Sequence, residues 1–307
     1  MRLALLFTLA SIFAVAAHAN DPWHDGYFPN VQLTDQDGKK VRFYDDVIKG
    51  KVVALNFIYT KCKDVCPADT AQMVQVANIL GDRIGKDIFF YSISIDPKND
   101  TPKALRRYKE MFGIGSNWTF LTGKKEDVTL LQRKLGLIGT QALANLREHN
   151  TSLILGNEKT AQWIKRSPYD HPKILANLLA NSMNNFVGAG EGQQPFSVAH
   201  EISGLTRGDT LFRSRCMACH TVGEGDRLGP DLAGVVARRS NAWLVRWLKE
   251  PDKMISAKDP IALELKKRYR NLPMPNLGLN DVDAEALIDY LKKEDARLAT
   301  TPKPTSH

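Results

Sequence analysis

The sequence predicts two domains, an α/β domain followed by an all-α domain. Apolar, strand-like runs alternate with helical patterns as far as about residue 187, whereas only helical periodicity follows residue 205. The length of 307 residues also exceeds what one small core usually holds. A hydrophobic share of 43% and a charged share of 25% are typical of a soluble globular protein.

The α/β domain is predicted to begin with a hairpin and to continue with buried strands. Apolar and polar residues alternate in 31–44 around an Asp-Gly turn. The apolar runs at 52–59 and 88–95 are typical of central strands buried on both faces, and 152–155 predicts another strand. Strands that alternate with helices favour a mostly parallel sheet.

Helices are expected between and after these strands. Pro67 suits the first turn of a helix that ends near Leu80, and Thr101-Pro102 opens a second helix. A third is predicted over 172–186. A glycine-rich segment then predicts a linker, so we assign the chain to a signal peptide, an α/β domain, a flexible linker, an all-α domain and a disordered tail at residues 1–19, 20–187, 188–204, 205–297 and 298–307.

The all-α domain shows two clear helical patterns. Trp243, Leu244, Trp247 and Leu248 recur as one apolar stripe of a helix. Asn280 predicts the N-cap of the last helix, since acidic residues follow it in the first turn.

The first residues are typical of an export signal. Arg2 precedes an apolar run over 3–17, and Ala17-His18-Ala19 matches an A-x-A cleavage site. The run is shorter than the ~20 residues that a membrane-spanning helix needs. We therefore expect a periplasmic mature protein without a membrane span, in a compartment that permits disulfides.

The net charge of +8 does not indicate a nucleic-acid partner. Basic residues are interleaved with acids, as in Lys124–Asp127, which predicts solvated faces and leaves an acidic protein partner open.

Cys216-Met217-Ala218-Cys219-His220 is a C-x-x-C-H motif, the attachment pattern of a c-type haem. The two thiols, Cys216 and Cys219, add to the vinyl groups of the haem, and His220 becomes the proximal iron ligand. A zinc site would need a second close pair of ligands, which the sequence around this motif lacks. Met274 is predicted as the distal ligand because prolines on both sides stiffen its loop. Met254, in a charged stretch, is predicted to be an apolar anchor.

Residues 205–295 resemble a class I cytochrome c. The residues that carry the resemblance are Gly208, Phe212, the C-x-x-C-H motif, Leu228–Leu232, the Met274-Pro275 loop and Tyr290 in the last helix. The resemblance implies that the Pro230 carbonyl accepts the other ring N–H of His220.

The second cysteine pair, Cys62 and Cys66, follows the first buried strand and precedes a helix. A dithiol in this position is thioredoxin-like, and the helix N-terminus is expected to lower the thiol pKa. Spacing of i, i+4 puts both sulfurs on one face, which suits Cu(I), a reversible disulfide or a structural disulfide. Two disulfides among all four cysteines are the weaker interpretation, because the cysteines form two separate motifs.

A third copper ligand must come from elsewhere in the chain. Among the candidates, His24 lies near the mature N-terminus, His149 immediately precedes a predicted strand, and His171 precedes a helix and is expected to be solvated.

Residues 28–187 resemble the Sco/SenC family of thioredoxin-like copper proteins. The matching segments are Thr60 with Cys62–Pro67, Ser94–Pro97, Asp100–Pro102, Trp118–Gly123, and His149 with Thr151. The chain departs from the family at Lys63, where proline is common. The resemblance implies a copper site of Cys62, Cys66 and His149, and a role in assembling the copper site of cytochrome oxidase, with the oxidase copper subunit or its assembly factors as partners.

The predicted protein is therefore an exported metallochaperone and electron-transfer protein that holds copper and haem c. Two alternatives remain open: a thiol-disulfide reductase that acts on cysteines of a partner, and a plain electron carrier whose first domain only docks. Turnover as an enzyme is the less favoured possibility.

Overall fold

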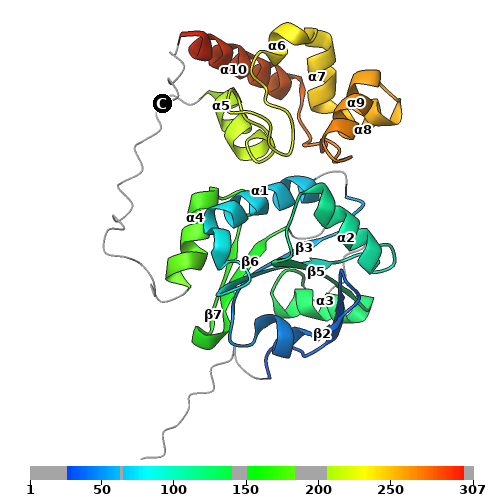
Figure 1. The fold of residues 1–307 in the computed structure, drawn as a ribbon, viewed down its shortest axis with the longest axis vertical. Coiled ribbons are helices and arrows are strands. Elements are labelled where there is room, and N and C mark those ends of the chain that lie inside the picture. Colours follow the sequence, from blue (N-terminus) through cyan, green and yellow to red (C-terminus); the bar gives the residue numbers. More distant parts are fainter. Residues whose placement is uncertain (1–25, 63–64, 140–150, 184–205, 301–307) are drawn as a thin grey trace, which may run out of the picture.

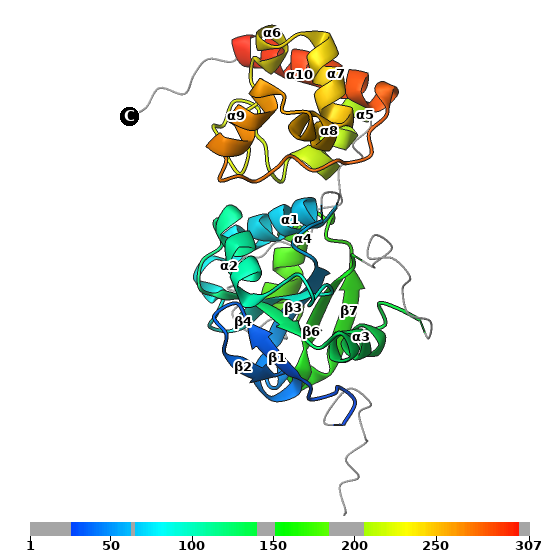
Figure 2. The same cartoon turned by 90° about the vertical axis from the view of Figure 1, so that its right-hand side faces the viewer.

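The computed structural model describes residues 26–62, 65–139, 151–183 and 206–300. These residues form two domains, an α/β domain and a helical domain, that face each other in both views of Figures 1 and 2. The signal peptide, the linker, His24 and His149 lie outside the described residues, as do residues 301–307 of the expected tail. The first three residues of that tail, 298–300, are the end of helix α10 (Asp281–Thr300).

The α/β domain is built on a seven-stranded sheet in the order β2-β1-β5-β4-β3-β6-β7. The strands are β1 (Gln32–Asp35), β2 (Lys40–Arg42), β3 (Val52–Ile58), β4 (Ile88–Ser94), β5 (Trp118–Gly123), β6 (Leu153–Asn157) and β7 (Gln162–Arg166). The expected hairpin is confirmed, because β1 pairs antiparallel with β2, and the two expected central strands are β3 and β4.

The expectation of a mostly parallel sheet is wrong. Only β3–β4 and β4–β5 are parallel among the described strands, and the remaining four pairs are antiparallel. An apolar run reports that a strand is buried, and it carries no information on the direction of its neighbours. The hairpins β1–β2 and β6–β7 add the antiparallel pairs at the two edges.

Helices cover both faces of this sheet. The elements are η1 (Phe43–Ile48), α1 (Val65–Leu80), η2 (Gly81–Arg83), α2 (Pro102–Met111), α3 (Lys125–Lys134), η4 (Glu158–Thr160), α4 (Pro172–Asn177) and η5 (Leu178–Ser182). Figure 1 shows α1 and α4 on one face and α3 on the other. The expected third helix is divided between α4 and η5. Helix α1 begins at Val65 and ends at Leu80, so the expected place of Pro67 in its first turn is confirmed.

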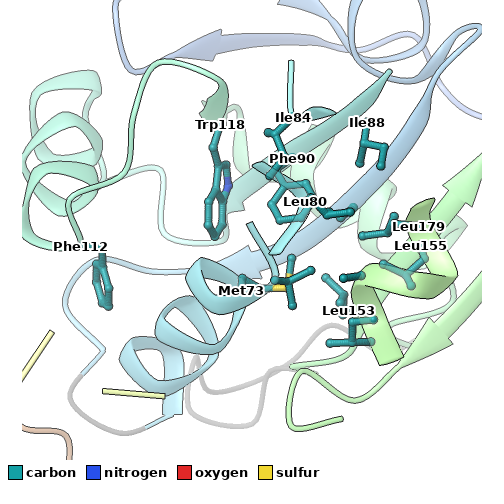
Figure 3. Packing of buried hydrophobic residues seen from close by; sticks show 14 of the residues in the cluster. Met73, Leu80, Ile84, Ile88, Phe90, Phe112, Trp118, Leu153, Leu155 and Leu179 are labelled. Carbon is teal, nitrogen blue, oxygen red and sulfur yellow. The ribbon is translucent and has the colours of Figure 1, made fainter. Parts of the chain in front are cut away.

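Strand β3 contributes to the cores on both faces, as its continuous apolar sequence requires. Val52, Ala54 and Ile58 pack with α1, α2 and α4, whereas Val53 and Leu55 pack with α3 and η1. Figure 3 shows the first of these cores, in which α1 residues such as Met73 and Leu80 meet side chains from the sheet. Side chains that point alternately to the two faces follow the two-residue period of a strand. Packing on both faces holds β3 in place, and the segment that carries the dithiol begins where β3 ends.

The helical domain contains α5 (Arg207–Leu211), η6 (Phe212–Cys216), α6 (Val235–Arg238), α7 (Asn241–Lys249), α8 (Pro251–Ser256), α9 (Pro260–Arg268) and α10 (Asp281–Thr300). The first and last of these helices cross closely at Gly208, where an added Cβ would lie 2.2 Å from the Ala286 carbonyl oxygen. Phe212 and Tyr290 pack beside this crossing with ring centroids 4.9 Å apart. The crossing places η6, and therefore the C-x-x-C-H motif, against the core.

Two further predictions for this domain are confirmed. Asn280 caps α10, since its Oδ1 accepts from the Asp283 N–H at 2.9 Å. Met254 is an apolar anchor with 1% exposure. In the part of the chain that the structure describes, none of the helices has the length and apolar character needed to cross a lipid bilayer.

Candidate metal centres

The first candidate centre is the pair Cys62 and Cys66, between the end of β3 and the first turn of α1. Both residues are buried, with 5% and 1% exposure. A hydrogen bond with the Cys62 thiol and then burial raise the pKa of Cys66 above that of an ordinary thiol. The two thiols are therefore in contact, and Cys66 holds its proton more strongly than an ordinary thiol does. The expectation of a lowered thiol pKa is wrong for Cys66, because these two effects exceed the influence of the helix N-terminus.

A buried carboxyl group, Asp100, joins the segment after β3, which leads into the dithiol, to the end of β4. Its carboxylate accepts hydrogen bonds from the Thr60 backbone N–H at 3.1 Å and from the Ser94 hydroxyl at 2.6 Å. Burial raises the pKa of Asp100, and these hydrogen bonds act in the opposite direction. Because Thr60 is two residues before Cys62, this contact fixes the start of the dithiol loop.

The other end of the loop is held from α2. The Tyr108 hydroxyl donates to the Cys66 carbonyl at 3.3 Å and lies 3.0 Å from the Thr70 hydroxyl. Both contacts are buried. The dithiol loop is thus fixed at its start by Asp100, from the loop before α2, and at its end by Tyr108, from α2.

Asp69 is the unusual residue of this centre. It is 5% exposed, and its Oδ1 has no hydrogen-bond partner among the described residues. Burial raises the pKa of Asp69 to about 7, a hydrogen bond with Tyr169 lowers it, and the charge of Cys62 raises it further. A carboxyl group that is half protonated near neutral pH therefore lies close to the two thiols. In the sequence, the position of Asp69 three residues after Cys66 was the feature that could have indicated its place beside the dithiol.

The predicted third copper ligand, His149, lies outside the described residues. Among the described residues, no three His, Cys, Asp or Glu side chains gather closely enough to hold a metal ion. His171 is exposed as expected, and its Nδ1 accepts from the Lys173 N–H at 3.2 Å as the N-cap of α4. The donors placed together here are two soft sulfurs, which fit Cu(I).

The second candidate centre is an apolar cavity of about 370 Å³ in the helical domain. All four residues predicted to hold a haem line it: Cys216, Cys219, His220 and Met274. Apolar walls come from α7, from α10 and from the loops before α6 and α10, including Leu228, Trp243, Leu244, Trp247, Leu272 and Leu291. A covalently attached haem fits this arrangement, because two thiols, an imidazole and a thioether line one apolar space.

His220 is oriented for iron ligation. Its Nδ1 lies 2.8 Å from the Pro230 carbonyl oxygen, so Nδ1–H donates there and Nε2 keeps its lone pair. Burial lowers the pKa of His220, which keeps the ring neutral. Gly229 makes room for the ring, since an added Cβ would lie 2.6 Å from Cε1. The expected contact between His220 and Pro230 is confirmed.

We expect Met274→Ala to keep the haem covalently attached but to remove the sulfur ligand opposite His220. Loss of a thioether ligand lowers the reduction potential of a haem. Visible spectra and potentiometry measure both effects. Met254→Leu is the control, since Met254 is a buried anchor and the exchange conserves volume. A Met274→Ala spectrum identical to that of the wild type would remove Met274 from the ligand set.

Comparison with protein families agrees with both centres. A family model described as SCO1/SenC matches residues 24–184, and one described as Cytochrome c matches residues 205–294. The first match covers more than half of the chain and includes Cys62, Cys66 and His149. The second includes the whole C-x-x-C-H motif and Met274.

Curated relatives match about a third of the chain. The SCO1 protein homolog of Bacillus subtilis is 38% identical over 91 residues, which are 29% of this chain and 45% of the relative. The Putative copper-binding protein of Stutzerimonas stutzeri is 30% identical over 109 residues, 36% of this chain and 52% of the relative. The chain thus spans about half the length of these relatives.

Solved structures similar to the chain include a SCO1/SenC family lipoprotein from Bacillus anthracis. It is 29% identical, with a TM-score of 0.42 over 51% of this chain and 92% of that chain. Bradyrhizobium japonicum ScoI with copper bound is 22% identical, with a TM-score of 0.40 over 51% and 96% of the two chains.

Proposed function

Because the chain belongs to the SCO1/SenC family and continues into a cytochrome c domain, we propose that it is an exported copper-binding and electron-transfer protein that supports assembly of the copper site of cytochrome oxidase. The observation that carries the proposal is the buried pair of contacting thiols, Cys62 and Cys66, at the end of β3. Its partners are the copper subunit of the oxidase or its assembly factors, and it works in the periplasm.

Copper is the cargo of the first domain. Cys62 and Cys66 supply two thiolates, and each thiol must lose its proton when the metal binds, so copper uptake releases protons. The pKa of Cys66 is raised, which means that binding strengthens as the pH rises. His149 supplies the third donor, an imidazole that suits Cu(II) as well as Cu(I).

We expect His149→Ala to weaken binding of Cu(II) more than binding of Cu(I), because two thiolates satisfy the softer ion. Competition titrations with a chelator for each oxidation state measure the two affinities. His171→Ala is the matched control, since His171 is an exposed N-cap residue, and it should bind as the wild type does. Equal Cu(II) retention by the His149→Ala protein would exclude His149 from the site.

The second domain holds haem c through Cys216, Cys219, His220 and Met274. A bound haem supplies single-electron transfer. The residues of this chain set its properties: Pro230 fixes the orientation of His220, and the apolar walls exclude water from the cavity.

A thiol-disulfide reductase is the second candidate. The contact between the Cys62 and Cys66 thiols favours it, because a disulfide can form there with little movement. The copper content of protein purified under reducing conditions separates the candidates, since a reductase keeps no copper.

The cellular test compares oxidase activity in a strain that lacks this protein after return of the wild type or of Cys62→Ala. Copper delivery predicts that only the wild type restores the activity at low copper. Full restoration by Cys62→Ala would mean that the protein is a plain electron carrier whose first domain only docks.

A further inference from the structure

We propose that the two domains form one docked unit, in which α1 of the α/β domain covers the haem-attachment face of the cytochrome c domain. The face is defined here as Met217–Cys219, Leu228 and Arg270–Leu272. The proposed function requires only that each domain binds its own group, so this inference goes beyond it. Both views of the molecule show α1 as the helix that faces the second domain (Figures 1 and 2).

The first contact joins α1 to the attachment motif itself. Gln75 Nε2 donates to the Ala218 carbonyl oxygen at 3.1 Å. Ala218 is 9% exposed and belongs to the same apolar cluster as Ala71 and Met73 of α1. The half-buried side chains that pack against this cluster include Val74 from α1 and Cys219, Leu228 and Leu272 from the second domain. The contact therefore combines apolar burial with a hydrogen bond.

The positions on α1 form one stripe. Pro67, Ala71, Val74 and Gln75 are spaced i, i+4, i+7 and i+8, which places them on one side of a helix. The core of the α/β domain takes the other side, through Met73, Val76 and Leu80. Ile79 is outside the contact, since it is 50% exposed with both domains in place.

A second contact lies at the loop after α2. An added Cβ on Gly113 would lie 2.6 Å from Nη1 of Arg270, so the guanidinium lies directly on this glycine. Arg270 and its neighbour Asn271 have φ values of +56° and +59°, a backbone conformation that is costly for residues with side chains. The strained pair projects Arg270 onto the first domain and leads directly to Leu272.

Arg215 of the second domain acts on the first domain through its charge. Arg215 lies close enough to Tyr169 for its charge to act on the pKa of that phenol, opposing the rise caused by burial and by Asp69. Arg215 also donates to the Leu277 carbonyl at 2.9 Å, which anchors it in its own domain. The contacts themselves come from two elements of the first domain, α1 and the loop after α2, and together they restrict the orientation of the domains.

Docking brings the two candidate centres together. Pro67, which directly follows Cys66, lines the same cavity as Cys216, Cys219 and His220. The wall of the haem cavity is thus completed by the residue next to a predicted copper ligand. An external redox partner must bind the cytochrome c domain on another face, or displace α1.

Small-angle X-ray scattering of the haem-loaded full chain tests the docking. The wild type should scatter as one body in which the two domains are in contact, as α1 and the second domain are in Figures 1 and 2. Val74→Glu should separate the domains and raise the radius of gyration by several ångströms, because a charge on the stripe would be buried against apolar side chains. Ile79→Glu, the same kind of change on the same helix, should leave the profile unchanged.

Arg270→Ala provides a second variant from the other domain, in case Val74→Glu alters the fold of α1. It should also raise the radius of gyration, while circular dichroism confirms unchanged helix content. A wild-type profile of two independently moving domains would overturn the inference, and so would wild-type profiles for both Val74→Glu and Arg270→Ala. Scattering measures neither copper binding nor electron transfer. The docking can therefore fail this test while the proposed function holds, and the oxidase-activity experiment tests that function separately.

Discussion

Replacing Cys216 and Cys219 together by alanine is expected to abolish covalent haem and to unfold the cytochrome c domain. The buried cluster next to the motif is small, since it consists of Phe212, Cys216, Leu279, Leu287 and Leu291. The adjoining cavity of about 370 Å³ would remain empty. Leaving such a site unfilled is expected to cost at least as much as one large-to-small core substitution, about 2–5 kcal/mol, which is a large part of the stability of a small domain.

Haem staining after denaturing electrophoresis and far-ultraviolet circular dichroism measure the two effects. The matched control is Cys62→Ala with Cys66→Ala, which also removes two buried cysteines but should keep stained haem and the helix content of the second domain. A double Cys216 and Cys219 variant with native helix content would contradict the view that the haem completes this core.

Asp69→Asn is expected to stabilise the α/β domain at pH 8 by up to about 4 kcal/mol, measured on reduced, metal-free protein. Burial raises the pKa of Asp69 from its ordinary 3.8 to about 7, and each pKa unit corresponds to about 1.4 kcal/mol. Between pH 4 and pH 7 the folded state binds the proton more strongly than the unfolded state. The free energy of unfolding therefore falls as the pH rises through this range, and the penalty stays constant above it.

Asparagine carries no charge, so the variant should lose this pH dependence and match the wild type near pH 4. Urea unfolding at pH 4, 6 and 8 measures the difference. Asp82→Asn is the control, since the side chain of Asp82 is 99% exposed and its ion pair with Lys86 lies at the surface. If Asp69→Asn destabilised the protein at pH 8 as much as at pH 4, the buried carboxyl group would be structural and neutral throughout.

The strands that the sequence predicted were those with a strong apolar pattern. Residues 52–58 and 88–94 are buried almost without interruption, and the sequence shows this directly. Strand β7 was not predicted, because its sequence is largely polar and it lies at an edge of the sheet. Strand β5 and helix α3 were not predicted as elements either, and the mixed direction of the sheet depends on these additional strands.

The residues of the candidate centres likewise differ in whether the sequence could predict them. Short motifs identified Cys62 and Cys66 and the haem residues Cys216, Cys219 and His220, because the chemistry requires close spacing in sequence. Met274 was predicted from the prolines on both sides of it. Asp69 and Tyr169 are a hundred residues apart in the chain, so their contact follows only from the fold. The docking of Gln75 on Ala218 depends on two folded surfaces, and no local pattern could predict it.

The copper and haem content of purified wild-type and Cys62→Ala protein tests the central claim most directly. Both should be produced with export and haem attachment, and be analysed by metal analysis and visible spectroscopy. We predict one copper and one haem per wild-type chain, and haem without copper in Cys62→Ala. Haem that acid-acetone extracts from the wild type, or copper retained equally by Cys62→Ala, would contradict the account.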